Sequence, residues 1–365
     1  NCKALQFKWT RSRSNLSSIS NALSSASISK DVHKIHALII ASGLDQSSFF
    51  SGKLISKYAQ LKDPTSSLSV FHRVSPTTNV YQWNSIIRAL TQNGLYSTAL
   101  DFYTRMQRME LVPDKFTFPS VINACAGLLD YGMGKFVHEH ISKMGFQTDL
   151  YIGNALVDMY ARFGYLGKAR RVFEEMPQRD NVSWNSLISG YSSNRYWEEA
   201  LEIYHWSILV GQVPDFFTVS SVLPACGGLV AVKEGEVVHG LAMKIGINED
   251  VVVGNGLLSM YFKFDRLMDA RRIFYEMVVR DTVSWNTVIC GLIQFNLFEE
   301  STKFFIEMMN RFTPDLLTIT SVIRACGHLR DLELGKFAHD LMVRIGYGCD
   351  ITAGNILIDM YGKCG

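Results

Sequence analysis

The chain repeats itself with a period of 101 residues, and this feature constrains its fold more than any other. The segment Asn181-Val-Ser-Trp-Asn-Ser-Leu-Ile-Ser-Gly190 recurs as Thr282-Val-Ser-Trp-Asn-Thr-Val-Ile-Cys-Gly291 and, more loosely, as Val80-Tyr-Gln-Trp-Asn-Ser-Ile-Ile87. Three further series keep this spacing, short by one residue in the last copy: Cys125, Cys226 and Cys326; His138, His239 and His339; Asn154, Asn255 and Asn355. We therefore expect one array of similar units, although 365 residues at ~150 per domain would suggest two or three separate cores.

Each period divides into units of 35, 35 and 31 residues, and the later units end in aspartate. The predicted array spans residues 13–365, while residues 1–12 are expected to be disordered or the remainder of a transit peptide. The units are 13–47, 48–79, 80–114, 115–149, 150–180, 181–215, 216–250, 251–281, 282–315 and 316–350, with a partial unit 351–365. Because the partial unit holds one predicted helix, we expect the chain to be a fragment of a longer protein.

Each unit is predicted to form two amphipathic helices. In 181–215 one apolar stripe has the helical spacing i, i+3, i+4, i+7, and a second stripe repeats it from Trp197. The first stripe consists of Trp184, Leu187, Ile188 and Tyr191. The turn is predicted at Ser192-Ser193-Asn194, and Pro214 is predicted to stop the second helix. One helix pair cannot bury both stripes, so neighbouring units must stack into an all-α solenoid.

The composition excludes several classes of protein. With 47% hydrophobic and 19% charged residues the chain is folded, and a net charge of +2 is too small to bind nucleic acid by charge density alone. Seven cysteines cannot form a complete disulfide framework, which favours a reducing compartment. No run of eighteen apolar residues predicts a membrane span. The first thirty residues hold nine serines and no acid, typical of the end of an organellar transit peptide, with a frayed terminus as the alternative.

The unit lengths and local motifs together resemble plant pentatricopeptide repeat proteins of the PLS subclass over residues 13–365. The motifs are the Val-Ser-Trp-Asn openings, Met-Tyr-Ala-Arg-Phe-Gly at 159–164, Ala-Arg-Arg-Val-Phe-Glu-Glu-Met-Pro at 169–177 and the Pro-Asp endings. The resemblance implies a right-handed superhelix of helix-turn-helix repeats in standard, long and short forms. The standard repeats would be 80–114, 181–215 and 282–315; the long ones 13–47, 115–149, 216–250 and 316–350; and the short ones 48–79, 150–180, 251–281 and the partial unit.

That family binds single-stranded RNA in mitochondria or chloroplasts, one base per repeat. The resemblance therefore implies the specificity arm of a cytidine-to-uridine editing factor, or another RNA-processing role, with the mitochondrion slightly favoured. The implied partners are organellar RNA and other editing-complex proteins, with no membrane, small-molecule substrate, cofactor or metal. The chain lacks His-x-Glu followed by Pro-Cys-x-x-Cys, the signature of a zinc deaminase, so we expect binding without catalysis. A protein-binding solenoid of the tetratricopeptide type is the alternative, and a structural scaffold is a third.

Asparagine recurs at the fifth position of standard and short repeats, and its amide can both donate to and accept from a base edge. By the resemblance, such an asparagine with an aspartate at the end of the repeat prefers uracil. The asparagines are Asn84, Asn154, Asn185, Asn255, Asn286 and Asn355, and the aspartates are Asp114, Asp180, Asp215, Asp281 and Asp315. Alternatively, the asparagines hydrogen-bond neighbouring backbone and join the repeats. The aspartates, like Asp149, Asp250, Asp350, Ser47 and Asn79, are also expected to cap helices.

Long repeats carry Ser17, Pro119, Ser220 or Thr320 at the fifth position, so the predicted RNA for 80–350 is U, any, U, U, any, U, U, any. Second-position side chains are predicted to sandwich the bases, with solenoid packing as the alternative. They are Tyr81, Val182, Val252 and Val283, with Phe116, Tyr151 and Phe217. Arg162, Lys263 and Lys363 are candidate phosphate contacts, although a cation there also complements the helix dipole. Cys125 and His138 are only two of the four ligands that structural zinc needs, so core packing is predicted for them.

Overall fold

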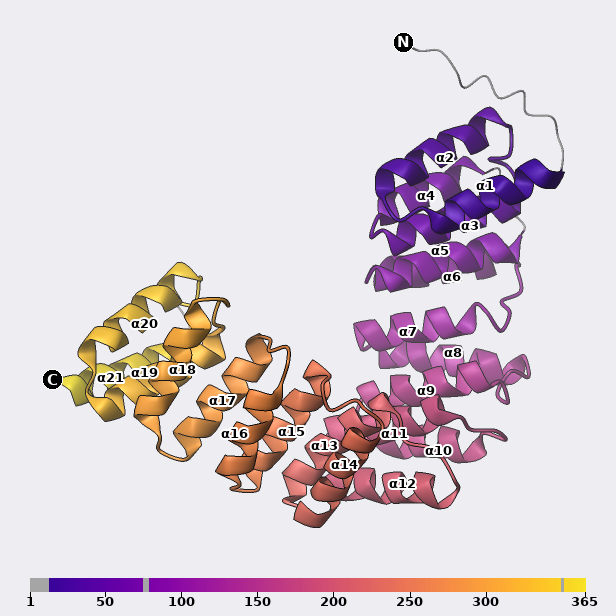
Figure 1. The fold of residues 1–365 in the computed structure, drawn as a ribbon. Coiled ribbons are helices and arrows are strands. Elements are labelled where there is room, and N and C mark those ends of the chain that lie inside the picture. Colours follow the sequence, from indigo (N-terminus) through magenta and orange to yellow (C-terminus); the bar gives the residue numbers. More distant parts are fainter. Residues whose placement is uncertain (1–12, 75–78, 349–350) are drawn as a thin grey trace, which may run out of the picture. The chain divides into compact units, whose positions relative to one another are not determined.

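The computed structural model describes residues 13–74, 79–348 and 351–365 (Figure 1). Residues 1–12, predicted to be disordered or a transit segment, and Asp350, a predicted cap, lie outside the described residues. In the described ranges the regular elements are all α-helices, which confirms the all-α prediction, and none of them has both the length and the apolar character to cross a membrane. The first eleven are α1 (Arg13–Ser25), α2 (Ser29–Ala41), α3 (Ser48–Gln60), α4 (Pro64–Arg73), α5 (Val80–Gln92), α6 (Tyr96–Arg108), α7 (Phe118–Leu128), α8 (Tyr131–Lys143), α9 (Leu150–Arg162), α10 (Leu166–Glu175) and α11 (Asn181–Ser193). The others are α12 (Trp197–Leu209), α13 (Phe216–Leu229), α14 (Val232–Lys244), α15 (Val251–Lys263), α16 (Leu267–Glu276), α17 (Thr282–Gln294), α18 (Phe298–Met309), α19 (Leu316–Leu329), α20 (Leu332–Arg344) and α21 (Ile351–Cys364).

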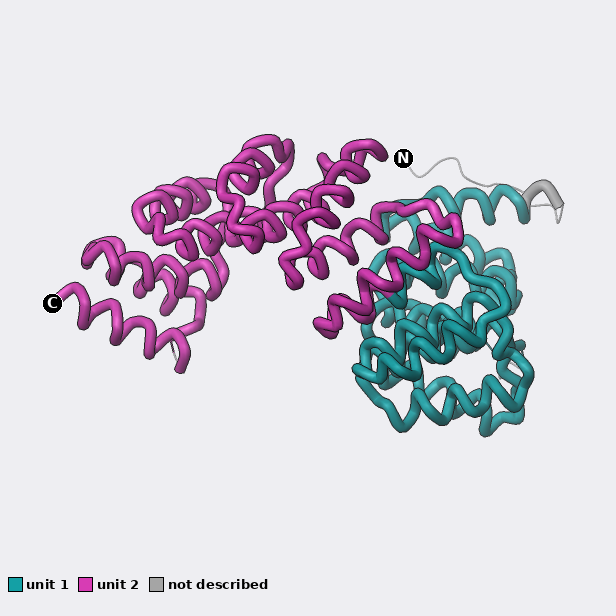
Figure 2. Tube along the Cα trace, turned by 90° about the horizontal axis from the view of Figure 1, so that it is seen from below, with its two compact units in different colours: residues 1–187 teal, residues 188–365 magenta. Residues whose placement is uncertain are grey.

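The chain separates into two compact units, one ending at Leu187 and the other beginning at Ile188, which Figure 2 colours teal and magenta. In both units the first helix of a repeat packs on the first helix of the next, as α3, α5, α7 and α9 do in one and α13, α15, α17 and α19 in the other. The second helices pack outside this layer, so that α6 contacts α5 and α7, and α18 contacts α17 and α19. Each of the ten predicted complete units holds two helices.

The turns between paired helices depend on left-handed backbone, which glycine supplies at Gly94 and Gly164 and other residues supply elsewhere. The turn predicted at 192–194 lies slightly later, because α11 continues to Ser193 and the left-handed residue is Arg195, with φ 65°. Asn194 donates from its side chain to the carbonyl of Gly190 at 2.8 Å, and its backbone N–H donates to the same carbonyl at 3.3 Å, so both groups close the last helical turn.

The predicted stop at Pro214 is wrong. Helix α12 ends at Leu209, and Gly211, the residue after the cap Val210, takes φ 85°. A Gly in this conformation turns the chain out of the helix, so the proline lies in the connection that follows.

The recurring tryptophans join a short repeat to the following standard repeat. Trp83, Trp184 and Trp285 are buried, each with its indole edge-on to a phenylalanine of the preceding second helix at 4.8 to 5.1 Å between ring centroids. These phenylalanines are Phe71 on α4, Phe173 on α10 and Phe274 on α16. Edge-to-face pairs of this kind add to the burial of the rings, so the conserved spacing of the tryptophans reflects a recurring repeat junction.

The recurring histidines join a long repeat to the following short repeat. His138 Nδ1 lies 2.8 Å from the hydroxyl of Tyr160, and His239 Nδ1 lies 2.7 Å from that of Tyr261. His36 with Tyr58 and His339 with Tyr361 repeat the bond at 3.0 Å. Cys125 is fully buried, and burial raises the pKa of its thiol to about 12. The cysteine and histidine of the 101-residue period therefore have packing and hydrogen-bonding roles.

Candidate nucleic-acid interface

The fifth-position asparagine of a repeat donates a hydrogen bond to the aspartate that ends the same repeat. The acceptor is far away in sequence but close in space, because the second helix returns the chain to the start of the first. The Nδ2 to carboxylate distances are 2.8 Å for Asn84 and Asp114, 3.1 Å for Asn154 and Asp180, 3.1 Å for Asn255 and Asp281, and 2.6 Å for Asn286 and Asp315.

A hydroxyl of the next repeat completes each set. Thr117 Oγ1 donates to Oδ1 of Asn84 at 2.6 Å, and the Thr117 backbone N–H donates to Asp114 at 3.0 Å. Ser183, Ser284 and Thr318 make the same two bonds at their own junctions. We call each Asn, Asp and Ser/Thr set an amide network. The network gives the asparagines the repeat-joining role of the alternative interpretation, but their partners are side chains instead of backbone groups.

The network orients the amide. Burial acts to raise the pKa of Asp180, but hydrogen bonds from the Ser183 backbone and from the Asn154 and Ser183 side chains outweigh it, so that the pKa lies below its ordinary value. Asp281 is lowered in the same way. An ionised carboxylate only accepts, so the NH₂ group of the asparagine must face it and the amide oxygen must face the hydroxyl. The network leaves one N–H and one lone pair of each amide for another partner.

Asn185, Asp215 and Asn355 complete the predicted asparagine and aspartate sets. Asn185 is half-buried on α11, and Asp215 belongs to the other unit, where it accepts the Thr218 N–H and caps α13. Asn355 is exposed on α21. Asp315 caps α19 while it holds Asn286.

The capping predictions are confirmed for most of these residues, and Asp114 and Ser47 are the exceptions. Asp149, Asp250 and Asp281 cap α9, α15 and α17, and Asn79 caps α5. Asp114 accepts from the N–H groups of Phe116 and Thr117 and so closes a turn that precedes α7, instead of capping the helix itself. Ser47 stands before α3, but its side chain makes no capping bond.

The second-position side chains are exposed and lie outside the buried core, although the ring of Tyr81 also packs on Gly52 of the preceding first helix, as the solenoid-packing alternative expects. Tyr81 is 47% exposed, and Val182, Val252 and Val283 are 54 to 56% exposed. Phe116, Tyr151 and Phe217 are more exposed still. In each unit, exposed aromatic and aliphatic side chains therefore recur at one position of successive first helices.

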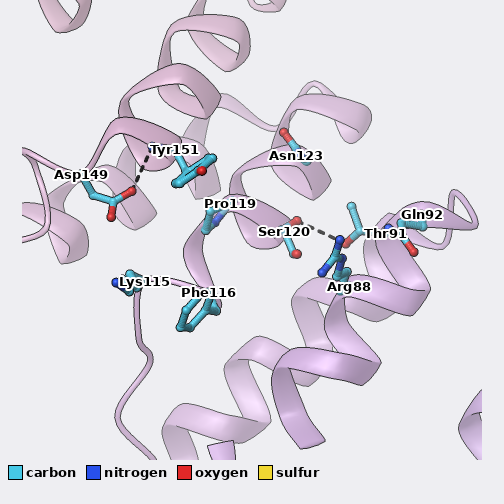
Figure 3. Close-up of a pocket in the computed structure, with 10 residues that line it drawn as sticks. All are labelled: Arg88, Thr91, Gln92, Lys115, Phe116, Pro119, Ser120, Asn123, Asp149 and Tyr151. Atoms are coloured by element: carbon cyan, nitrogen blue, oxygen red, sulfur yellow. Dashed lines mark hydrogen bonds between the residues drawn. The ribbon is translucent and has the colours of Figure 1, made fainter. Parts of the chain in front are cut away.

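Two adjoining cavities lie between second-position side chains in the first unit. One, of about 430 Å³, has Tyr81 and Phe116 in its wall together with Asn84 and Asp114. The other, of about 560 Å³, has Phe116 and Tyr151 in its wall with Pro119 and Asp149. Figure 3 shows Pro119 with Tyr151 on one side and Phe116 on the other. Each cavity thus combines two second-position side chains with the fifth and last residues of one repeat.

A third cavity, of about 400 Å³, lies in the second unit at the corresponding place in the repeat 316–350. The second and fifth residues of this repeat, Leu317 and Thr320, line the cavity. In the cavity wall the rings of Phe298 and His328 are stacked, with 4.4 Å between their centroids. The second and fifth residues of a long repeat therefore line a cavity in both units.

The three candidate phosphate contacts differ in their partners. Arg162 donates to Asp158 at 2.8 Å and Lys363 to Asp359 at 2.6 Å, each across one turn of its own helix. Lys263 is exposed and makes no ion pair with the residues that the structure describes; its stem lies along Gly227 of the preceding repeat.

Sequence reasoning missed three residues of this surface. Phe49 and Leu317 are second-position residues that are 49% and 59% exposed, and the register of their units would have found them. Arg88 lines both cavities of the first unit. No periodic signal marks it, because Ser189 and Cys290 replace it in the later periods.

Models of the pentatricopeptide repeat match this sequence at 78–127, 154–181, 182–205, 255–281 and 280–328. The chain belongs to the pentatricopeptide repeat family. Among its relatives from Arabidopsis thaliana, pentatricopeptide repeat-containing protein At3g03580 is 58% identical over 347 residues, covering 95% of this chain and 39% of that protein. At3g23330, a putative member, is 35% identical over 86% of this chain and 49% of its own length. The chain therefore spans less than half of these relatives.

Two further findings concern location and fold. Pentatricopeptide repeat-containing protein At1g11290, also from Arabidopsis and described as chloroplastic, is 32% identical over 92% of this chain and 41% of its own length. The crystal structure of the pentatricopeptide repeat protein PPR10 in complex with an 18-nt psaJ RNA element has a TM-score of 0.71 and 19% identity, covering 90% of this chain and 50% of that one. This likeness shows that the fold is that of stacked pentatricopeptide repeats.

Proposed function

We propose that the chain binds single-stranded RNA along its layer of first helices, one nucleotide per repeat. The observation that carries the proposal is the pair of adjoining cavities between Tyr81, Phe116 and Tyr151, each with the fifth and last residues of one repeat in its wall. Aromatic side chains stack on base faces at about 1–3 kcal/mol per base, and this needs no excess of positive charge. The RNA in the PPR10 structure supports the same class of ligand here.

Base choice would come from the part of each amide that its network does not use. Asn84 and Asp114 line the same cavity, and the N–H and lone pair that Asn84 keeps would pair with one donor and one acceptor on the Watson–Crick edge of a base. Asn154 and Asn286 are 7% exposed, so a base would meet only the rim of the amide. The proposed RNA order over 80–350 is U, any, U, U, any, U, U, any, because the long repeats lack asparagine.

The array 13–365 would serve as the specificity arm of an organellar editing factor of the PLS subclass. Repeat lengths of 35, 35 and 31 support this assignment. The junctions support it too, since long repeats meet the next repeat through a histidine–tyrosine pair, whereas standard and short repeats do so through an amide network, to which the short repeats add a tryptophan–phenylalanine pair. Relatives described as chloroplastic support an organelle. The proposal assigns RNA recognition to this arm. Deamination is assigned to other parts of the editing machinery, whose proteins would be the partners of this arm.

The test is binding of a fluorescent RNA of the proposed order by the whole chain at moderate salt, against an RNA with purines at the specified positions. We expect the first RNA to bind more tightly. Equal affinity for the two would overturn the base order, and no binding of either would favour the protein-binding solenoid.

Phe116→Ala tests the RNA contact without disturbing the fold, because the Phe116 side chain is 68% exposed. It should weaken RNA binding by about 5- to 100-fold with the melting temperature unchanged. Phe136→Ala is the matched control, since Phe136 is 49% exposed on α8, the second helix of the same repeat. Equal affinities for the two variants would place the RNA elsewhere.

A further inference from the structure

Arg88 occupies a position on the first-helix layer that no recognition role so far accounts for. It lies one helical turn after Asn84 on α5, is exposed, and lines both cavities of the first unit. Among the described residues, only Arg88 and Phe116 line both cavities. The guanidinium makes no hydrogen bond or ion pair within the described parts of the chain, whereas Arg162 and Arg171 are paired with carboxylates.

A side chain that lines two adjoining cavities lies beside the part of a ligand that connects one cavity to the other. If successive bases fill the Asn84 and Pro119 cavities, the connecting group is the sugar and phosphate between them. A guanidinium binds phosphate through two parallel N–H donors, and it keeps its charge at any physiological pH. A residue that recognises one base edge would instead line one cavity only.

We propose that Arg88 binds the phosphate that links the nucleotide on repeat 80–114 to the nucleotide on repeat 115–149. The proposal rests on the proposed RNA-binding function and adds a backbone contact to it. This contact holds the second nucleotide without regard to its base, at the repeat whose fifth residue, Pro119, has no donor. The larger cavity also contains Lys115, whose ammonium lies 5.4 Å from the centroid of the Phe116 ring, and the carboxylate of Asp149.

The contact is particular to this junction. In the corresponding cavity of the second unit, Cys290 replaces Arg88 and its Sγ lies 3.3 Å from Ser321 Oγ. The cation there is Arg324, which occupies the position of Asn123 on the following first helix. Each of these two cavities therefore has one arginine in its wall, supplied by the first helix of the standard repeat in one unit and by that of the long repeat in the other.

The test compares Arg88→Ala with Arg108→Ala, which removes the same charge from the last turn of α6, away from both cavities. Arg88→Ala should weaken RNA binding about tenfold, equally for all four bases opposite repeat 115–149. It should also reduce the slope of log affinity against log salt by about 0.7, the value for one phosphate of a single strand. Arg108→Ala should leave both quantities unchanged.

A second arm uses RNA in which that one phosphate is a neutral methylphosphonate. The affinity of the wild-type chain for this RNA should fall by the same factor, and the affinity of Arg88→Ala should not fall further. Affinity of Arg88→Ala equal to that of the wild type would overturn the phosphate contact, and so would a loss seen with one base only. Failure of the wild-type chain to bind any RNA would overturn the proposed function itself, and this assignment with it.

Discussion

Asn154 and Asp180 lie at opposite ends of one repeat, 26 residues apart, and are joined by a 3.1 Å hydrogen bond between the amide nitrogen and a carboxylate oxygen. Ser183, the third residue of the next repeat, bonds to both. The residues proposed to recognise a base therefore also hold two repeats together. Substituting such an asparagine changes stability as well as recognition, so affinity measurements on these variants need a folding control.

Asn286→Ala should lower the free energy of unfolding by about 1–3 kcal/mol, because it removes the hydrogen bonds that the buried Asn286 makes with Asp315 and Thr318. The measurement is urea unfolding followed by circular dichroism. Asn355→Ala is the matched control, since Asn355 has the same position in its repeat but is exposed on α21. Its effect should stay within about 0.5 kcal/mol. Equal losses for both variants would contradict a stabilising role of the network.

Acid should weaken the array through its half-buried histidines. Burial, the largest cause, lowers the pKa of His138 and of His239 below the ordinary value, while each ring bonds to a tyrosine. The unfolded chain then binds more protons than the folded one below about pH 6.5, so stability falls as the pH drops through that value. The aspartates with lowered pKa keep their contribution until the pH falls towards their own unfolded pKa near 4.

Urea midpoints at about pH 7.5 and about pH 5.5 measure this dependence. The wild-type chain should lose stability between the two, and the double variant His138→Asn, His239→Asn should lose clearly less. A drop of the same size in the double variant would assign the acid sensitivity to other groups.

The helix pairs, the tryptophan stripe and the asparagine register could be predicted from the sequence, because each depends on spacing along the chain. The amide networks could not. Their asparagines and aspartates are 26 to 30 residues apart, and recurrence of two residues does not show that they touch. The turn after α11 was misplaced for a related reason: Arg195, not a glycine, adopts the left-handed conformation there. Arg88 has no counterpart in the other periods, so only the cavities reveal it.

Gly291→Ala should destabilise the chain by about 1–3 kcal/mol, although alanine is the better helix former. A Cβ at this position of α17 would lie 2.5 Å from the ring of Phe262, which is itself buried in the preceding first helix. Gly240→Ala on α14 is the control, since no atom lies within 4 Å of its Cβ, and it should stabilise by about 0.5–1 kcal/mol. Thermal melts distinguish the two signs, and a stabilised Gly291→Ala would show that the first helices are not closely packed.

Pro119→Asn should convert a repeat without base preference into one that prefers uracil. Pro119 lies in the first turn of α7, where an asparagine is tolerated, and it shares its cavity with Asp149, the aspartate that ends its repeat. Asp149 accepts from the N–H groups of Tyr151 and Ile152, so a carboxylate is already oriented there. Because Ile152 has no hydroxyl, the new amide oxygen would keep both lone pairs for the base.

The expected gain is about threefold to tenfold in affinity for uracil over adenine opposite repeat 115–149, the value of one added hydrogen bond. Pro119→Ala is the control, because it removes the ring without adding a donor, and it should show no preference. Competition binding with RNAs that differ only at that base measures the ratio. An unchanged ratio for Pro119→Asn, in a variant that still binds the uridine-rich RNA, would show that the fifth residue does not face the base.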